Sequence, residues 1–214
     1  MADISSFAQN TPVPQKAPAS VGVPPKAAKK SPIRPATSAD INMIHARLME
    51  AIDTSPYYVD EFKEFEKQRM GKNYLRTLLA ADPYHLMILL AGDKPAGFMI
   101  TSPQYGTLWL HWSYIFPEMR RASIAMMGLR ALIAHYDNGK FHKISTYTKD
   151  GNPAVALLKR FKFNLTCVLK NHIFGEDYLL YELPLTKTEQ GYDLGTGLGR
   201  LGRLKARLRS FLPI

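Results

Sequence analysis

Residues 107–136 constrain the fold most, because they place a basic loop between a β-strand pattern and an apolar helix pattern. The strand pattern covers 107–115, the helix pattern begins near Ser123, and Arg120 and Arg121 lie between them. A helix that starts directly after a strand points its free N–H groups and the positive end of its dipole at whatever lies before it. This segment therefore predicts an anion-binding site next to a sheet.

Composition limits the class of protein. The chain has 214 residues and is 46% hydrophobic, which suits one domain with one sizeable core. Its formal charge of +10 favours an acidic partner such as nucleic acid, anionic lipid or a polyphosphate cofactor. Cys167 is the only cysteine, which excludes a disulfide framework or a cysteine zinc cluster and favours a reducing, cytoplasmic location. No apolar run reaches the ~20 residues that span a bilayer.

Two terminal segments differ from the rest of the chain. Residues 1–31 are rich in proline and read either as a flexible tail or as a docking arm that a partner orders. Residues 187–214 contain five glycines from Gly191 to Gly202 and leucines spaced by three and four, which predicts a Gly-rich linker and a basic amphipathic helix. We expect that helix to pack on the domain or a partner subunit, to lie on an anionic membrane, or to contact nucleic acid. Its basic residues are Arg200, Arg203, Lys205, Arg207 and Arg209.

Residues 32–186 form the central domain. A short strand at 33–36 precedes a helix that Ser38 caps and that ends near Ile52, and a second helix covers 59–81. The inner side of the second helix is predicted to carry Phe62, Phe65, Leu75, Leu78 and Leu79. The later strands are expected at 85–91, 96–101, 107–115, 143–147, 163–169 and 178–183, and the later helices at 123–136 and 152–160. The order β-α-α-β-β-β-α-β-α-β-β predicts an α/β fold, with a mixed sheet covered by helices on both faces.

Two motifs carry a resemblance to a known family. Arg120, Ser123 and Ala125 fall in a frame that, in the acyl-CoA loop of the GNAT acetyltransferases, reads Arg or Gln, two residues, Gly, one residue, Gly or Ala. Downstream, Asn152, a helix and a closing Phe163 are similar to a second motif of that family. The chain thus resembles the GNAT superfamily from about Ile33 to Leu185. The resemblance implies an α+β, mostly antiparallel sheet flanked by helices, and transfer of an acetyl group from acetyl-CoA to a primary amine, on a small molecule or a protein.

The resemblance also implies which residues bind the cofactor. The N–H groups of residues 121–125 would cradle the pyrophosphate, and the arginines would add charge-assisted contacts. A bulge would splay the strand at 107–115 from the next strand and expose backbone to the pantetheine arm, with an N–H near Ile115 as the oxyanion donor. The expected cofactor-binding residues are Tyr114, Ile115, Phe116, Arg120, Arg121, Ala122, Ser123, Ile124, Ala125 and Asn152. No metal is expected.

Catalysis requires a deprotonated amine and a proton for the leaving thiolate. His111 is the candidate base, and the alternative is a half-buried histidine with satisfied hydrogen bonds. Strict alternation places it on one face with Trp109, Ser113 and Ile115. Family members often use a tyrosine as the acid, but Leu158 stands at that position, so we consider Tyr147 or Tyr105 instead. Candidates to line an acceptor pocket, or to be plain core, are Trp109, Trp112, Tyr105 and Tyr114.

A second hypothesis treats the chain as an interaction protein. Ser123 and Lys162 replace family glycines, and the backbone at Lys162 is expected to be strained if that position requires a positive φ. In this hypothesis the fold is a catalytically degenerate scaffold. Residues 1–31 and 191–214 would dock it into a homo-oligomer or a larger assembly, such as a bacteriophage virion.

Overall fold

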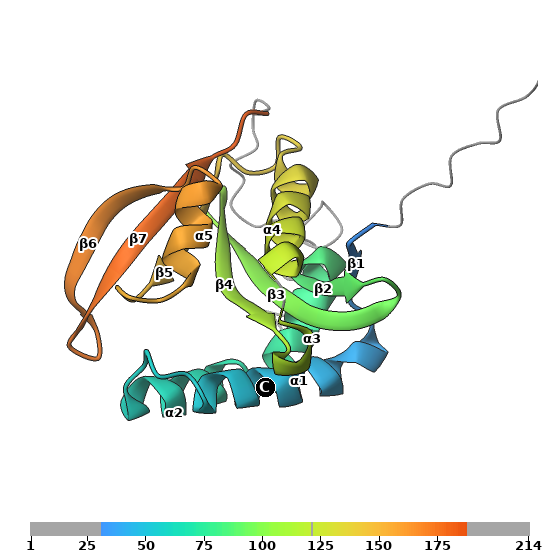
Figure 1. Cartoon of the computed structure of the whole chain (residues 1–214), viewed down its shortest axis with the longest axis horizontal. Helices are drawn as coiled ribbons and strands as arrows, with labels where there is room; N and C mark the ends of the chain where they lie inside the picture. The colour runs from blue at the N-terminus through green and yellow to red at the C-terminus, as the bar shows by residue number, and fades with distance from the viewer. Residues whose placement is uncertain (1–30, 121, 188–214) are drawn as a thin grey trace, which may run out of the picture.

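The computed structural model describes residues 31–187 except residue 121, and these form one seven-stranded sheet with helices on both faces (Figure 1). The strand order is β1-β2-β3-β4-β5-β7-β6. The strands are β1 (Ile33–Pro35), β2 (Leu86–Ala91), β3 (Lys94–Gln104), β4 (Thr107–Ile115), β5 (Lys143–Thr148), β6 (Asn164–Ile173) and β7 (Glu176–Pro184). The helices are α1 (Ile41–Asp53), α2 (Asp60–Arg69), α3 (Lys72–Ala81), α4 (Ala122–Tyr136) and α5 (Ala154–Arg160). Both terminal segments discussed above lie outside the described residues, apart from residues 31 and 187.

The sheet is antiparallel except between β4 and β5. These two strands run parallel and pair at only three positions, from Thr107 opposite Lys143 to Trp109 opposite Ser145. Beyond Trp109 they separate. The mixed, mostly antiparallel sheet that the element order and the resemblance predicted is confirmed, and so is the splaying of β4 from β5.

Two hydrophobic cores cover the two faces of the sheet. The first is formed by α4 and α5 against the strands and includes the buried side chains of Leu129, Leu132 and Leu158. The second is formed by α1 and α3 and includes Ile44 and Leu75, which are both fully buried. The positions of α1 to α3 on one face and of α4 and α5 on the other can be followed in Figure 1. The prediction of helices on both faces is therefore confirmed.

The single helix predicted over 59–81 is wrong, since two helices occupy this stretch. Helix α2 ends before Met70, whose side chain is fully buried in the second core, and Gly71 is extended with φ −61° and ψ 163° before α3 begins. The chain changes direction there. Phe65, predicted to face inward, is 53% exposed, and Glu66 is the buried residue of α2 instead.

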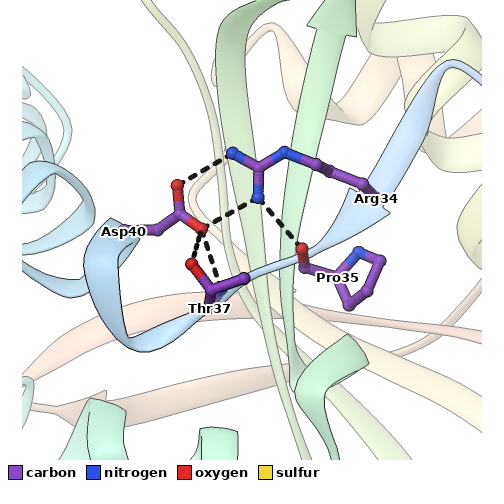
Figure 2. A network of polar contacts seen from close by, with 4 residues as sticks. All are labelled: Arg34, Pro35, Thr37 and Asp40. Atoms are coloured by element: carbon purple, nitrogen blue, oxygen red, sulfur yellow. Dashed lines mark hydrogen bonds and ion pairs between the residues drawn. The ribbon is translucent and has the colours of Figure 1, made fainter.

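The expected cap at Ser38 is also wrong, because Thr37 and Asp40 organise the entry into α1. The Asp40 Oδ2 atom accepts hydrogen bonds from the backbone N–H and the hydroxyl of Thr37, both at 2.8 Å. Arg34 donates to both carboxylate oxygens of Asp40 at 2.8 Å, and Figure 2 shows that its guanidinium also reaches the carbonyl of Pro35. The guanidinium holds the pKa of Asp40 well below its usual range. This network ties β1 to the start of α1.

Gly97 in β3 allows the close approach of β4 that shapes the cleft described below. A Cβ atom at this position would lie 2.3 Å from the carbonyl oxygen of Tyr114 and 3.1 Å from the Cα of Ile115. Both are backbone atoms, so the strand itself must move to relieve the clash. We expect Gly97→Ala to lower the free energy of unfolding by at least about 2 kcal/mol in urea titrations.

Gly71→Ala is the matched control for this prediction. A Cβ atom there would meet only the carbonyl oxygen of Gln68, at 3.5 Å, and the backbone already has a negative φ. We expect a change below about 1 kcal/mol. Equal urea midpoints for the two variants would show that β3 and β4 separate without cost.

Candidate active site

A cavity of about 930 Å³ opens where β4 and β5 separate. At the point of separation the hydroxyl of Thr146 donates a hydrogen bond of 2.8 Å to the carbonyl of Leu110, so a side chain replaces the backbone pairing. The cavity is lined by residues of β4, β5, α4, α5 and the connection between α1 and α2. The cavity lies between the diverging parts of β4 and β5, beyond Trp109 and Ser145, and reaches both faces of the sheet.

Backbone donors of β4 face this cavity. The N–H of Phe116 donates to the carbonyl of Ala96 across to β3, at 2.9 Å. Because backbone groups alternate in direction along a strand, the N–H groups of Ser113 and Ile115 point away from β3. Both residues line the cavity. The end of β4 therefore offers unpaired backbone groups that an extended ligand can use as a strand partner.

A bulge in β4 changes which side chains share a face. Ile100 pairs with Trp112 and Thr101 with Leu110, which leaves His111 as the extra residue. After the bulge, Trp112 and Tyr114 pack against the second core, while Ile115 packs against the first. The expectation that His111 shares one face with Trp109, Ser113 and Ile115 is wrong, because it assumed unbroken alternation.

His111 lines the cavity but is in a poor environment for a charge. Its Nε2 atom lies 2.6 Å from the hydroxyl oxygen of Ser102, within hydrogen-bond distance. Burial first, and then the positive charge of Arg69 and the neighbouring His85, lower the pKa of His111 to about 3. The imidazole is neutral at pH 7, yet a group with so low a pKa takes up a proton from an alkylammonium weakly.

The loop before α4 contributes Arg120 to the cavity. This side chain is exposed and lines the cavity. Burial raises the pKa of the Tyr114 phenol, and the positive charge of Arg120 acts in the opposite direction. Ala125, in the first turn of α4, lines the cavity as well. The first turn also leaves free N–H groups that point toward the loop. Arg121 and the side chain of Ala122 lie outside the described residues.

Three of the predicted cofactor residues point elsewhere. Ser123 and Ile124 line a separate pocket of about 370 Å³ between α4 and the turn from β2 to β3. Phe116 is buried in the second core, with the guanidinium carbon of Arg47 located 4.7 Å from its ring centroid. The side chain of Ser123 therefore does not occupy the cleft. Only its backbone can contribute to an anion site there.

The start of α5 closes the cavity on the side of β5. The Oδ1 atom of Asn152 accepts a hydrogen bond of 2.9 Å from the N–H of Ala154, and Asn152 lines the cavity. Leu158 also lines it and is 4% exposed, within the first core. Lys162 has a φ of 63°, so the condition under which its backbone would be strained is met. The helix thus holds Asn152 at the cavity and presents an apolar side chain at the position where the resemblance implies a tyrosine.

Of the two tyrosines considered as proton donors, Tyr147 lines the cavity and Tyr105 does not. Tyr105 lies in the turn between β3 and β4, near the end where β4 and β5 are still paired. It is 76% exposed and has a φ of 49°. The ring of Tyr147 packs on Trp109 with centroids 4.8 Å apart. Burial raises the pKa of the Tyr147 phenol, which is therefore protonated at pH 7. Trp109 supports this ring and is not part of the lining.

The aromatic wall on the α1–α2 side was predicted only in part: Trp112 and Tyr114 were candidates and line the cavity, but Tyr57 and Tyr58 were missed. Tyr57 and Tyr58 follow the helix-ending Ser55 and Pro56 and line the cavity beside Trp112. Tyr58 stacks on Phe62 with centroids 4.5 Å apart and meets Trp112 edge-on at 5.9 Å. Burial raises the pKa of Tyr58 to about 12, so its phenol is uncharged. Two adjacent tyrosines after a helix-breaking proline were the signal available in the sequence.

A buried ion pair fixes Trp112 in this wall. The indole N–H of Trp112 donates to Glu66 Oε1 at 2.7 Å, and Arg69 donates to both carboxylate oxygens of Glu66 at 2.7 Å. Glu66 is 2% exposed. The carboxylate is thus engaged by α2 and by the indole, behind the cavity surface.

Comparison with known proteins agrees with this geometry. The model of the acetyltransferase (GNAT) family matches residues 46–163, which is more than half of the chain, and the chain belongs to this family. No curated protein sequence is significantly similar to it.

Solved structures show the same fold at low sequence identity. A phosphinothricin acetyltransferase from Sinorhizobium meliloti, solved in complex with AcCoA, is 17% identical with a TM-score of 0.59, covering 74% of this chain and 93% of its own. An N-acetyltransferase from Staphylococcus aureus Mu50 is 20% identical with a TM-score of 0.58, covering 72% and 98%. The ribosomal-protein-S18-alanine N-acetyltransferase from Escherichia coli is 18% identical with a TM-score of 0.53, covering 74% and 96%.

Among the described residues, no helix combines the length and apolar character needed to cross a membrane.

Proposed function

We propose that this protein transfers an acetyl group from acetyl-CoA to a primary amine. The observation that carries the proposal is the cavity between β4 and β5, which combines strand-edge N–H groups with the N-terminal end of α4. An extended amide chain ending in phosphates needs both features. The amides pair with a strand edge, and the phosphates need N–H groups and positive charge.

The residues present fit acetyl-CoA. Arg120 supplies positive charge at the loop before α4, and the first turn of α4 supplies N–H donors for phosphate oxygens. Ser113 and Ile115 supply backbone groups for the pantetheine amides. Bound in the cleft, acetyl-CoA supplies an activated acetyl group and a thiolate leaving group. The similar enzyme from Sinorhizobium meliloti was crystallised with AcCoA, which supports this choice.

Groups of the protein would have separate roles in the acetyl transfer. With acetyl-CoA bound, the N–H of Ile115 would donate a hydrogen bond to the acetyl carbonyl oxygen, where negative charge would develop. The amine enters from the side of Tyr58 and Trp112. Tyr147 would supply the proton that the leaving thiolate needs, since its phenol is protonated at pH 7 and Leu158 has no proton to give. His111 stays neutral and helps to hold the bulge through Ser102.

This arrangement predicts the pH dependence of turnover. Because the pKa of His111 is lowered to about 3, its protonation state does not change between pH 5 and 9. The amine must therefore lose its proton to water, and kcat/KM should rise with pH in this range without levelling off near 6.5. A plateau near pH 6.5 that disappears in His111→Gln would identify His111 as the base and contradict the proposal.

Two measurements test the function itself. Calorimetric titration with acetyl-CoA, with coenzyme A as the control, should give micromolar binding, equivalent to about −8 kcal/mol. Mass spectrometry of a panel of primary amines incubated with acetyl-CoA should then detect N-acetylated products that are absent without the protein. Absence of binding at millimolar acetyl-CoA, or binding without any acetylated amine, would reject the proposed activity.

A further inference from the structure

We infer that the acceptor is a small arylalkyl monoamine, an amine whose body is an uncharged aromatic ring. The inference rests on the proposed function and concerns the half of the same cavity that faces the α1–α2 connection. This acceptor half is defined by Tyr57, Tyr58, Trp112 and Tyr147. The inference depends on what these side chains offer to a ligand and on which charges are missing beside them.

Rings form the surface of the acceptor half. Tyr58 and Trp112 form one pair, with centroids 5.9 Å apart, and Tyr147 backed by Trp109 forms another at 4.8 Å. Each pair comes from different elements, so tertiary packing holds the rings in place. Aromatic faces and edges favour another ring in the space between them. They also tolerate one nearby ammonium group through cation–π attraction.

Carboxylates are missing from the cavity surface. None of its lining residues, among those the structure describes, is an aspartate or a glutamate. Two acids lie behind the wall, and both are already engaged. Glu66 is held by Arg69 and the indole of Trp112, and Glu50, whose Oε1 accepts from the Tyr114 hydroxyl at 3.4 Å, pairs with Arg47 at 2.9 Å. A polyamine would bring several ammonium groups into this space and find no anionic partner, and desolvating unpaired charges is costly. The acceptor half therefore disfavours polyamines.

Positive charge is also missing where an acidic acceptor would need it. The arginines that line the cavity are Arg120, which the proposed function assigns to the phosphates of acetyl-CoA, and Arg160 at the end of α5. Neither is among the four residues that define the acceptor half. Arg69 is bound to Glu66. An amino acid acceptor would bury its carboxylate among rings without a counter-ion. The acceptor half offers no partner for several ammonium groups and no partner for a carboxylate. The acceptor class that fits both observations is a monoamine with an uncharged body.

The size of the cavity is compatible with a small acceptor beside the cofactor arm. Its volume of about 930 Å³ must hold the acetyl-pantetheine arm and the acceptor together. This total is in the range of a single ligand pocket. One aromatic ring with a short aminoalkyl chain is compatible with the remaining space.

Competition between amines tests the inference directly. The full-length protein would be incubated with acetyl-CoA and equal amounts of 2-phenylethylamine, propylamine, spermidine and phenylalanine, and the products quantified by mass spectrometry. We expect 2-phenylethylamine to have the highest kcat/KM, at least about tenfold above the others. A higher kcat/KM for spermidine or phenylalanine would overturn the inference and leave the proposed acetyltransferase activity intact.

A binding measurement distinguishes the inferred acceptor class from the proposed acetyltransferase activity. The same amines would be titrated calorimetrically into the protein saturated with coenzyme A. Binding of 2-phenylethylamine without its acetylation would reject the proposed activity but support the inferred ligand class. Failure of 2-phenylethylamine to bind in the millimolar range would overturn the inference.

Variants of Tyr58 show whether its ring carries the preference. Tyr58→Leu should raise the KM for 2-phenylethylamine about tenfold and leave that for propylamine unchanged, while Tyr58→Phe keeps the ring and should match the wild type. Phe174→Leu is the matched control, because Phe174 is an exposed ring outside the cavity lining. Thermal unfolding would confirm that all three variants are folded. Equal KM values for Tyr58→Leu and the wild type would contradict the role of this ring.

Discussion

Replacing Arg120 by glutamate should weaken acetyl-CoA binding about 100-fold. Arg120 is an exposed cation that lines the cavity directly before α4, where the proposed phosphate site lies. A charge-assisted hydrogen bond to an anion contributes about 1.5–3 kcal/mol, and the new carboxylate adds repulsion to that loss. At 1.4 kcal/mol for each factor of ten, the expected dissociation constant rises about 100-fold in calorimetric titrations.

Arg130→Glu is the control for this prediction. It makes the same charge change on α4, at an exposed position that does not line the cavity. We expect its affinity for acetyl-CoA to stay within about threefold of the wild type at 0.15 M salt, where distant surface charges are screened. If both variants lose affinity equally, net charge governs binding and the assigned phosphate site is wrong.

Replacing Tyr147 by phenylalanine should lower kcat about 100-fold with little change in the KM for acetyl-CoA. The substitution removes only the phenol oxygen and leaves the ring that packs on Trp109. General acid catalysis by one side chain typically contributes about 10²–10⁴-fold. Because Leu158 also lines the cavity but has no transferable proton, no side chain at that position takes over the role. Steady-state kinetics with an acetylated amine would measure the change.

Tyr105→Phe removes a phenol oxygen from a tyrosine outside the cavity and should leave kcat unchanged. This comparison decides between the two proton donors considered from the sequence. An unaffected Tyr147→Phe enzyme would show that the thiolate leaves without help from this tyrosine. The family position held by Leu158 would then need no substitute.

The local sequence predicted the order of the strands and helices well, and its errors have identifiable physical causes. Strand and helix periods over 85–183 were strong because apolar side chains repeat at two or at three to four residues. The helix over 59–81 was predicted as one because its apolar residues on either side fit a helical pattern, whereas the chain turns at Met70 and Gly71, where the Met70 side chain is buried in the second core. Ser38 satisfied a capping rule, but Arg34 and Thr37 together recruit Asp40 instead.

The sequence by itself determined the strand–loop–helix segment around Arg120 and the order of the strands along the chain, because both depend on contacts between near neighbours in the chain. Only the tertiary structure decided the bulge at His111 and the meeting of Tyr58 with Trp112. A bulge depends on how β4 pairs with β3, and the aromatic wall depends on how the α1–α2 connection packs over the sheet. These are contacts between distant segments. They set the low pKa of His111 and the apolar character of the acceptor half.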